Sequence, residues 1–549
     1  MTVGERVVAR LASEGIDTVF GIPGKQTLPL NEAMATHGIR FVVARHETAV
    51  SHQAWGYAET SGEMAATVVV PGPGDMNAMN GLKNALNDCT PLVHVAVETD
   101  PAVRGGDGIH ETPPDTYDNV VKANRLVEGP QEAVATLTEA MRTARTPPKG
   151  PVRVGIPKNF LTMDVPQAAP SADGVPTLPE PDPHAVATAT TTLQAADEPV
   201  VIAGGGVRTA EATAELRAVA ERLDAPVVTT YKGKGTLPEA HPLSAGVFSG
   251  ATSPELEALV ADADAALAVG TDFDAVAFAR WERDLPDELV HVTLHAADVG
   301  TGYEPSVALI ADAGATLAAL ADRLPAGILD DDSPGVERAQ SVRASDAARI
   351  AALTEGDDPP LTSPSALAAV RAAVPEGATV AVDAGGFRIW TLVSFPAAGP
   401  RSYVNPGSWA TMGTGLPSAI GAKLATPDED VVALTGDGGL LMCIHELHTL
   451  AAEGIDVTVV AFRNDDYAII SEEAERSYGL DEMAYGWRDA PLSLTDIAAG
   501  MGVEAERVET ADAVERAVSA AVEADEPRLV SVPTDPTEPQ ASEWFAGEK

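Results

Sequence analysis

The chain has 549 residues, too many for one hydrophobic core, and its length suggests about three domains. Its hydrophobic content of 45% predicts well-packed globular domains, although its net charge is -45. The acidic residues are dispersed and lysines are scarce, a pattern typical of proteins adapted to high salt, where repulsion is screened. This charge argues against a nucleic acid as a partner, because a phosphate backbone would be repelled.

The two cysteines, Cys89 and Cys443, both lie in apolar stretches of the sequence. A disulfide framework is therefore not expected, and a reducing compartment fits best. The first segment, MTVGERVVARLASEG, predicts an amphipathic helix rather than a signal peptide, and no apolar run reaches the length of a membrane span. We therefore expect a cytoplasmic protein that does not associate with membranes.

Alternating β-branched runs and helical periods follow the first helix along most of the chain. Two linkers are predicted, a Pro-rich one at 165–185 and an acidic one at 329–341, and they divide the chain into domains at 1–165, 184–325 and 360–535. The predicted strands of the outer blocks are 17–22, 41–46, 66–71, 92–97, 379–385, 431–436, 457–462 and 528–533. The middle block carries PVVIAGGGV (199–207) and AALAVGTDFD (265–274). This pattern predicts an α/β fold with three parallel-sheet domains, of which the outer two are alike.

The stretch LTGDGGLLMC (434–443) places an aspartate between glycines at the end of a buried strand. A helix is predicted to start near Gly439 and to end at Gly454, and the next strand ends at the sequence RNDDY. Because a strand–helix–strand crossover makes the two strands parallel, Asp437 and Asn464 should meet at the carboxyl edge of the sheet if the strands are neighbours. Their oxygens are hard ligands suited to Mg²⁺, and the helix N-terminus favours a phosphate. In isolation, such a turn is more often only a β–α turn with a capping aspartate.

The segment GDGGLLMC…VVAFRNDDY resembles the diphosphate-binding motif of thiamine diphosphate (ThDP) enzymes. The resemblance implies that Asp437, Asn464 and the carbonyl group of Asp466 bind Mg²⁺, and that Arg463 replaces an asparagine usual in the family. Further residues that we expect to contact the cofactor are the glycines Gly385, Gly436, Gly438 and Gly439.

Two further segments carry the same resemblance. The first, VVARHETAVSHQAWGYAETSG (42–62), places Glu47 at a strand-to-helix junction, where a capping acid would be the ordinary interpretation. By resemblance, Glu47 is the catalytic glutamate that contacts the aminopyrimidine ring, a task that requires an apolar site. The second, GSWATMGTGLPSAIGAKLA (407–425), aligns Met412 with the apolar residue that supports the bent cofactor.

The order of these segments is most similar to the acetolactate synthase group, which decarboxylates one 2-oxo acid and joins the remaining fragment to a second. The family places each active site between the first domain of one subunit and the third domain of another, so a homodimer or homotetramer is implied. Its central domain holds a non-catalytic FAD in these synthases, which leaves flavin binding open here.

The substrate side departs from the synthase pattern. Ile109, His110 and Glu111 replace Phe-Gln-Glu, and Glu473 replaces a tryptophan that selects the acceptor. Gly386 and Phe387 stand where a glutamine and a histidine usually contact the diphosphate. His110 is either a proton donor to the substrate or a polar loop residue, and Glu473 is more consistent with a solvated acid.

Three alternatives stay open. A simple decarboxylase of the benzoylformate type fits the third block about as well, but Val70 and Pro71 replace its His-Ser pair. An NAD or FAD oxidoreductase is disfavoured because Gly204, Gly205 and Gly206 lack the full dinucleotide-binding spacing. A regulatory subunit without cofactor is disfavoured by the joint presence of the residues named above.

Overall fold

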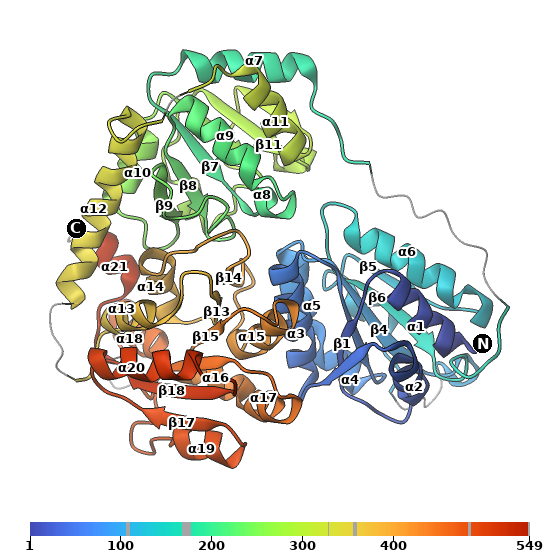
Figure 1. Cartoon of the computed structure of the whole chain (residues 1–549). Coiled ribbons are helices and arrows are strands. Elements are labelled where there is room, and N and C mark those ends of the chain that lie inside the picture. The colour runs from blue at the N-terminus through green and yellow to red at the C-terminus, as the bar shows by residue number, and fades with distance from the viewer. Residues whose placement is uncertain (106–109, 167–176, 328, 355–358, 481–484, 547–549) are drawn as a thin grey trace.

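The computed structural model describes residues 1–549 except 106–109, 167–176, 328, 355–358, 481–484 and 547–549. It contains three parallel sheets of six strands each, every one flanked by helices (Figure 1). The predicted α/β class with three parallel-sheet domains is thereby confirmed. Ile109 and residues 167–176 of the predicted Pro-rich linker lie outside the described residues.

The first sheet has the strand order β2-β1-β3-β4-β6-β5. Its strands are β1 (Thr18–Gly21), β2 (Arg40–Val43), β3 (Ala65–Val69), β4 (Leu92–Glu98), β5 (Ala123–Leu126) and β6 (Val152–Pro157). The helices around it are α1 (Val3–Ser13), α2 (Leu28–His37), α3 (Glu47–Ser61), α4 (Pro73–Asn77), α5 (Met79–Asn87) and α6 (Ala133–Arg145). The predicted amphipathic helix α1 starts with a capping box formed by Thr2 and Glu5.

The middle sheet has the order β12-β11-β10-β7-β8-β9, which is the arrangement of a Rossmann-like fold. Its strands are β7 (Pro199–Ala203), β8 (Val227–Thr230), β9 (Ser244–Phe248), β10 (Ala265–Val269), β11 (Leu289–Thr293) and β12 (Val307–Ile310). The helices of this part are α7 (Pro183–Ala195), α8 (Gly205–Thr209), α9 (Thr213–Leu223), α10 (Pro254–Ala261), α11 (Ala313–Arg323) and α12 (Pro334–Thr354).

The third sheet has the order β14-β13-β15-β16-β18-β17, which repeats the order of the first sheet strand for strand. Its strands are β13 (Thr379–Val382), β14 (Tyr403–Val404), β15 (Val431–Gly436), β16 (Thr458–Arg463), β17 (Glu504–Arg507) and β18 (Arg528–Pro533). The helical segments are α13 (Ser363–Ala373), α14 (Gly386–Ser394), α15 (Gly415–Ala425), α16 (Asp437–Cys443), the 3₁₀ turn η6 (Ile444–Glu446), α17 (Leu447–Glu453), α18 (Ala468–Tyr478), α19 (Leu494–Gly500), α20 (Ala511–Val522) and α21 (Ala541–Ala546). The predicted likeness of the two outer blocks is therefore confirmed.

Two local predictions differ from the structure. The predicted acidic linker at 329–341 is half helical, because Pro334 opens α12 instead of breaking the chain. Proline is tolerated in the first turn of a helix, where its missing N–H costs nothing. The single helix predicted after Gly439 begins at Asp437 and is interrupted by η6, but it ends as predicted at Gly454, whose φ is +62°.

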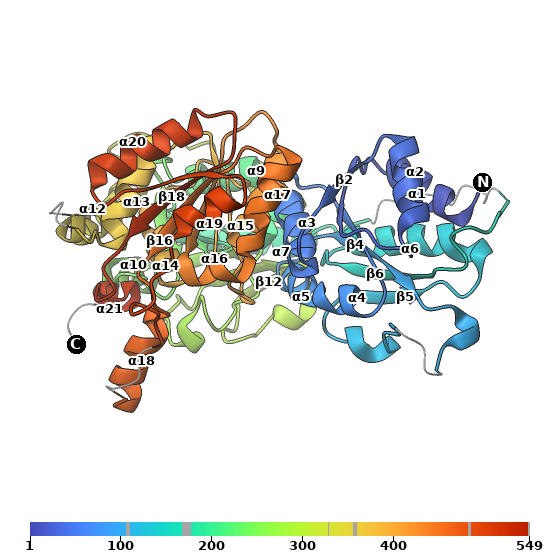
Figure 2. The ribbon, with the colours of Figure 1, turned by 90° about the horizontal axis from the view of Figure 1, so that it is seen from below.

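Helix α3 of the first domain packs along α15 of the third (Figures 1 and 2). The backbones touch at Gly56 and Gly421: a Cβ on Gly56 would lie 2.2 Å from the Ser418 carbonyl oxygen, and one on Gly421 would lie 1.9 Å from that of Gln53. Only glycine permits such an approach. Elsewhere, no helix among the described residues is both long and apolar enough to cross a membrane.

We predict that Gly421→Ala lowers the melting temperature by about 5 °C, because overpacking costs about 1–3 kcal/mol and each kcal/mol shifts the midpoint by about 2–4 °C. The gain in helix propensity, about 1 kcal/mol, is the smaller effect. Thermal unfolding followed by circular dichroism measures this. Gly377→Ala is the matched control, since a Cβ there meets nothing within 4 Å. An unchanged midpoint for Gly421→Ala would show that the two helices do not touch.

Candidate active site

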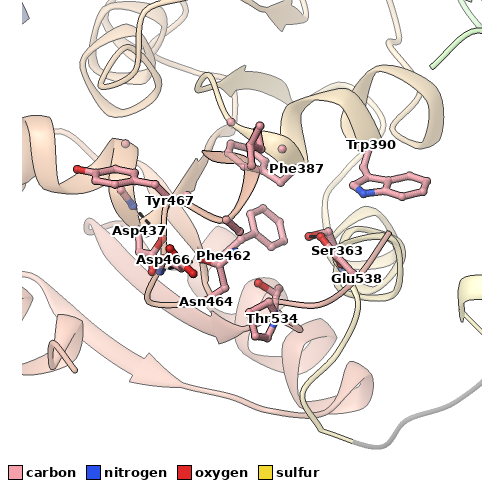
Figure 3. Close-up of a pocket in the computed structure, with 18 of the residues that line it drawn as sticks. Ser363, Phe387, Trp390, Asp437, Phe462, Asn464, Asp466, Tyr467, Thr534 and Glu538 are labelled. Carbon is pink, nitrogen blue, oxygen red and sulfur yellow. Dashed lines mark hydrogen bonds between the residues drawn. The ribbon is translucent and has the colours of Figure 1, made fainter. Parts of the chain in front are cut away.

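A cavity of about 170 Å³ lies at the carboxyl edge of the third sheet (Figure 3). The strand ends of β13, β15 and β16 meet there, since β15 pairs with both neighbours in parallel. The structure brings together in its lining every third-block residue predicted to bind cofactor or metal: Gly385, Met412, Gly436, Asp437, Gly438, Gly439, Asn464 and Asp466. Apolar side chains, among them Phe387, Trp390 and Phe462, form the remaining wall.

Asp437 is the first residue of α16 and is only 4% exposed. Its Oδ2 accepts a hydrogen bond of 2.7 Å from the backbone N–H of Asp465, and its Oδ1 accepts one of 2.8 Å from that of Gly438. Burial raises the pKa of Asp437 to about 6. No ion pair joins Asp437 to a basic side chain within the described part of the chain. A buried carboxylate that faces a cavity in this way is suited to a cation.

Asn464 and Asp466 complete a set of oxygen donors after β16. The Asp466 carboxylate is already engaged, because Oδ1 accepts from Ser471 Oγ at 2.7 Å and Oδ2 pairs with Arg488 at 3.0 Å. The Asp466 backbone N–H donates to Asn464 Oδ1 at 3.2 Å. No group of three or more His, Cys, Asp or Glu side chains gathers for a metal among the described residues, so a site here must use amide and carbonyl oxygens. Carboxylate, amide and carbonyl oxygens together fit Mg²⁺.

The glycines of the turn leave room that a side chain would fill. A Cβ on Gly438 would lie 2.8 Å from the Tyr467 ring and 3.3 Å from the terminal methyl group of Met412. Met412 therefore reaches over the turn that carries Asp437. The start of α16 thus faces the cavity, and the N-terminus of a helix favours an anion.

Phe387 makes one wall of this cavity apolar. Its ring stacks on Phe462 with a centroid distance of 5.3 Å and an interplanar angle of 24°. A Cβ on Gly436 would lie 3.4 Å from the same ring. The pair Gly386–Phe387, which replaces a polar pair usual in the family, thus offers an apolar surface instead of diphosphate donors.

Asp383 is a residue of this site that sequence reasoning missed. It is fully buried at the end of β13, and its Oδ1 accepts from the backbone N–H groups of Ala384 (2.8 Å), Gly413 (2.9 Å) and Thr414 (3.2 Å). Its Oδ2 accepts from Thr435 Oγ1 at 2.9 Å. Burial raises the pKa of Asp383 to about 6. One carboxylate therefore ties the turn after β13, the loop that carries Met412 and the end of β15. An acid ending a buried strand, in TVAVDAG, was the available signal.

Glu47 and His110 do not line this cavity. Glu47 opens α3, is half-buried and accepts a hydrogen bond of 3.1 Å from Asn77 Nδ2. A Cβ on Gly74 would lie 2.9 Å from Glu47 Oε1, and one on Gly72 would lie 2.7 Å from the Cα atom of His110. Glu47 and His110 thus flank the same turn after β3, and they form a second group of predicted residues. His110 is exposed and has a φ of +69°.

Glu473, Arg463 and the two cysteines, also singled out from the sequence, do not line this cavity. Glu473 is partly exposed on α18, with 42% of its side chain accessible, and it pairs with Arg476, as expected for a solvated acid. Arg463 forms two hydrogen bonds of 2.8 Å with the Asp465 carboxylate, so it supports the loop that carries Asn464. Cys89 and Cys443 are both free.

A larger cavity, of about 540 Å³, lies at the carboxyl ends of the central strands. Two of its three Lys and Arg side chains pair with carboxylates: Arg208 pairs with Glu59 at 2.7 Å, and Lys232 pairs with Glu59 at 2.9 Å and with Asp88 at 3.1 Å. The third, Lys149, donates to the Thr209 carbonyl oxygen at 3.4 Å. Five further carboxylates line it, those of Glu211, Asp272, Asp274, Asp298 and Asp312.

The glycine run at this cavity is explained by packing. A Cβ on Gly204 would lie 2.2 Å from the Gly270 carbonyl oxygen. The charge of the lining does not fit the diphosphate of a flavin dinucleotide, and we derive no step through FAD.

Three segments of the chain match models of one protein family. Residues 1–119 match the thiamine pyrophosphate enzyme N-terminal TPP binding domain, 186–320 match the central domain, and 383–532 match the C-terminal TPP binding domain. The acetolactate synthase isozyme 1 large subunit of Escherichia coli is 31% identical over 92% of this chain and 88% of its own length. The chain belongs to the thiamine pyrophosphate enzyme family.

Other similar proteins are named for more than one activity. A probable acetolactate synthase large subunit of Methanocaldococcus jannaschii is 27% identical over 98% of this chain and 93% of its own length. A probable 2-ketoarginine decarboxylase of Pseudomonas aeruginosa is 34% identical over 85% of this chain and 82% of its own length. The resemblance to the acetolactate synthase group is confirmed, and the family includes a relative named as a decarboxylase.

We predict that Asp383→Ala weakens the binding of ThDP with Mg²⁺ by about 10- to 100-fold, the usual effect of losing an outer-shell partner. The loss follows because the Met412 loop and the turn before Asp437 lose their common acceptor. Asp383→Asn keeps an acceptor for the same N–H groups and should retain most of the affinity. Thermal-shift titration measures both variants. Affinity equal to wild type in Asp383→Ala would contradict the role of this carboxylate.

Proposed function

We propose that this chain is a ThDP- and Mg²⁺-dependent enzyme that decarboxylates a 2-oxo acid and joins the remaining fragment to a second one, as acetolactate synthases do. The observation that carries the proposal is the cavity in which Asp437, Asn464 and Asp466 gather under Met412. The similarity to acetolactate synthases along 92% of the chain supports it.

The third domain holds the cofactor in this proposal. The Asp437 carboxylate, the Asn464 amide oxygen and the Asp466 carbonyl oxygen hold Mg²⁺, and the turn glycines bring backbone N–H groups to the diphosphate. Met412 supports the angle between the two rings of the cofactor. When bound, ThDP supplies an acidic carbon and an electron sink for decarboxylation. The fixed oxygens and the apolar wall of Phe387 and Phe462 orient it and keep water out.

Glu47 moves the proton of the aminopyrimidine ring, and it does so in a site completed by a second copy of the chain. It lies outside the cavity of its own chain, where it is half-buried. Large apolar side chains are exposed near both groups: Met76 (48%) beside Asn77, and Met442 (51%) on α16. Burial of such side chains stabilises a subunit contact. We therefore propose a homodimer or homotetramer in which the partner subunit covers Glu47. We also propose that His110, which lies beside Glu47, donates a proton to the substrate oxygen.

A second candidate is a 2-oxo acid decarboxylase that does not join fragments. The 34% identical relative named as a 2-ketoarginine decarboxylase favours it. The partly exposed acid Glu473 replaces the tryptophan that selects the acceptor in synthases, and an acid is suited to a guanidinium group. This alternative changes the substrate and leaves the roles of Asp437 and Glu47 as proposed.

One assay separates the two activities. The protein is incubated in concentrated KCl with ThDP and Mg²⁺, and either pyruvate or 5-guanidino-2-oxopentanoate is added. We expect acetolactate from pyruvate. Release of CO₂ with an aldehyde product, and no acetolactate, would establish the decarboxylase instead. No CO₂ from either substrate would contradict the choice of both substrates.

Glu47→Gln tests the catalytic assignment. We expect this variant to bind ThDP and Mg²⁺ with unchanged affinity and to lose turnover by about 100-fold or more, because general acid–base catalysis contributes about 10²- to 10⁴-fold. The matched control is Glu32→Gln, an exposed acid on α2. Undiminished activity in Glu47→Gln would overturn the assignment.

A further inference from the structure

Glu446 is a buried carboxylate that the proposed mechanism does not use. It ends the 3₁₀ turn η6, in the same helical run that Asp437 opens, and its exposed fraction is 0%. A carboxylate is seldom buried fully unless its oxygens are satisfied. Its partners therefore indicate what it does.

The partners of Glu446 lie mainly in the other domain. Oε1 accepts hydrogen bonds from the backbone N–H groups of Arg45 at 2.8 Å and His46 at 3.1 Å. Oε2 accepts from Gln53 Nε2 at 3.0 Å and from Thr449 Oγ1 at 2.6 Å. The His445 ring nitrogen Nε2 lies 3.5 Å from Oε1. Three of the four hydrogen bonds thus cross from the third domain to the start of α3 and its second turn.

These bonds hold the backbone immediately before Glu47. His46 is the N-cap of α3, and its own ring nitrogen accepts from the Thr48 N–H at 3.2 Å. The N–H groups of Arg45 and His46 have no α-helical acceptor, because the chain is still turning from β2 into the helix. Leaving a buried donor without a partner costs about 1–3 kcal/mol, so loss of the carboxylate would loosen this turn. A negative group near a helix N-terminus also interacts favourably with the helix dipole.

We propose that Glu446 is a positioning residue that fixes the start of α3 and thereby aims the Glu47 carboxylate for proton transfer. The proposal rests on the proposed function of Glu47. Asp437, the proposed metal ligand, opens this helical run, and Glu446 lies nine residues after it. The same run therefore holds the metal ligand and the residue that anchors α3, the helix of Glu47. Glu446 touches neither cofactor nor substrate in this role.

The same run provides an internal comparison. Glu453, on α17, also reaches the first domain, where its Oε1 accepts from the Val43 N–H at 3.1 Å and its Oε2 lies 3.7 Å from Arg40. Its contact is with strand β2 and not with the start of α3. General weakening of the domain contact should therefore follow from a change at either glutamate, whereas misplacement of Glu47 should follow only from a change at Glu446.

The experiment uses the full-length protein with ThDP and Mg²⁺ and compares three variants. Glu446→Asp keeps the charge but is one methylene too short to reach both N–H groups. Glu446→Gln keeps an acceptor for them, while its amide group can donate to Thr449 and to the Gln53 oxygen, which has no partner among the described residues. Glu453→Asp is the matched control for shortening.

Three quantities are measured: affinity for ThDP, kcat and KM, and the rate of hydrogen–deuterium exchange at the acidic carbon of bound ThDP. The exchange rate reports the proton step that Glu47 serves and is independent of the substrate. We expect Glu446→Asp to lower the exchange rate and kcat together by about 10- to 100-fold, the effect of misplacing a catalytic group by about 1 Å. Its affinity for ThDP should stay within about threefold of wild type, because its contacts lie outside the cofactor cavity. Glu446→Gln and Glu453→Asp should exchange at nearly the wild-type rate.

Exchange at the wild-type rate in Glu446→Asp would overturn the positioning role. An equal decrease in Glu453→Asp would also overturn it, since domain contact in general would then be the cause. Failure of the proposed function gives a different result: wild-type protein would not bind ThDP, or Glu47→Gln would exchange as fast as wild type.

Discussion

The contact between the backbones of α3 and α15 is the constraint on which the rest of the structure depends. Gly56 and Gly421 let the two helices approach until carbonyl oxygens of one face the backbone of the other. The first and third domains are thereby fixed in one relative position. The loop that carries Met412 leads directly into α15, and Glu446 can reach the start of α3 only at this separation. Met412, the proposed support of the cofactor, and Glu47, the proposed catalytic acid, are thus placed by the same packing.

Asp383 and Asp437 are both buried carboxylates of the third domain, but they differ in the hydrogen-bond donors around them. Asp383 accepts from three backbone N–H groups and a threonine hydroxyl, so its oxygens are filled by the protein itself. Asp437 accepts from the backbone N–H groups of Gly438 and Asp465 and lines the cavity. Burial raises the pKa of both to about 6. The first is therefore suited to holding loops together, and the second to receiving a cation.

Much of the fold was predictable because buried parallel strands are continuous apolar runs. All eight strands predicted for the outer blocks are present. The strands that were missed are short or polar, such as β17, whose residues are Glu-Ala-Glu-Arg, and β6, which contains Arg153. Arg153 is tolerated in the sheet because it pairs with Asp75 at 2.7 Å and also with Glu98. Such compensation comes from distant segments, so periodicity in one strand cannot reveal it.

In the candidate site, too, some residues were predictable from the sequence and others were not. Asp437 and Asn464 were predictable because the carboxyl ends of neighbouring strands must meet. The structure pairs Gly436, the residue before Asp437, with Phe462, two residues before Asn464. Asp383 and Glu446 were not predictable, because their function lies in bonds to residues that are 30 and about 400 positions away.

Glu47 is only half-buried on one chain, which indicates that its site is incomplete there. The proton shuttling proposed for Glu47 needs dry, apolar surroundings. Among the described residues of one chain, however, the side-chain partner of Glu47 is Asn77, which is itself exposed. The cavity around Asp437 is equally unfinished, since Met442 and Ile470 beside it remain 51% and 54% exposed. Each chain thus presents two incomplete halves held rigidly apart by one helix pair. In the proposed homodimer, a twofold arrangement would place the Glu47 half of each chain against the Asp437 half of the other and bury both apolar rims.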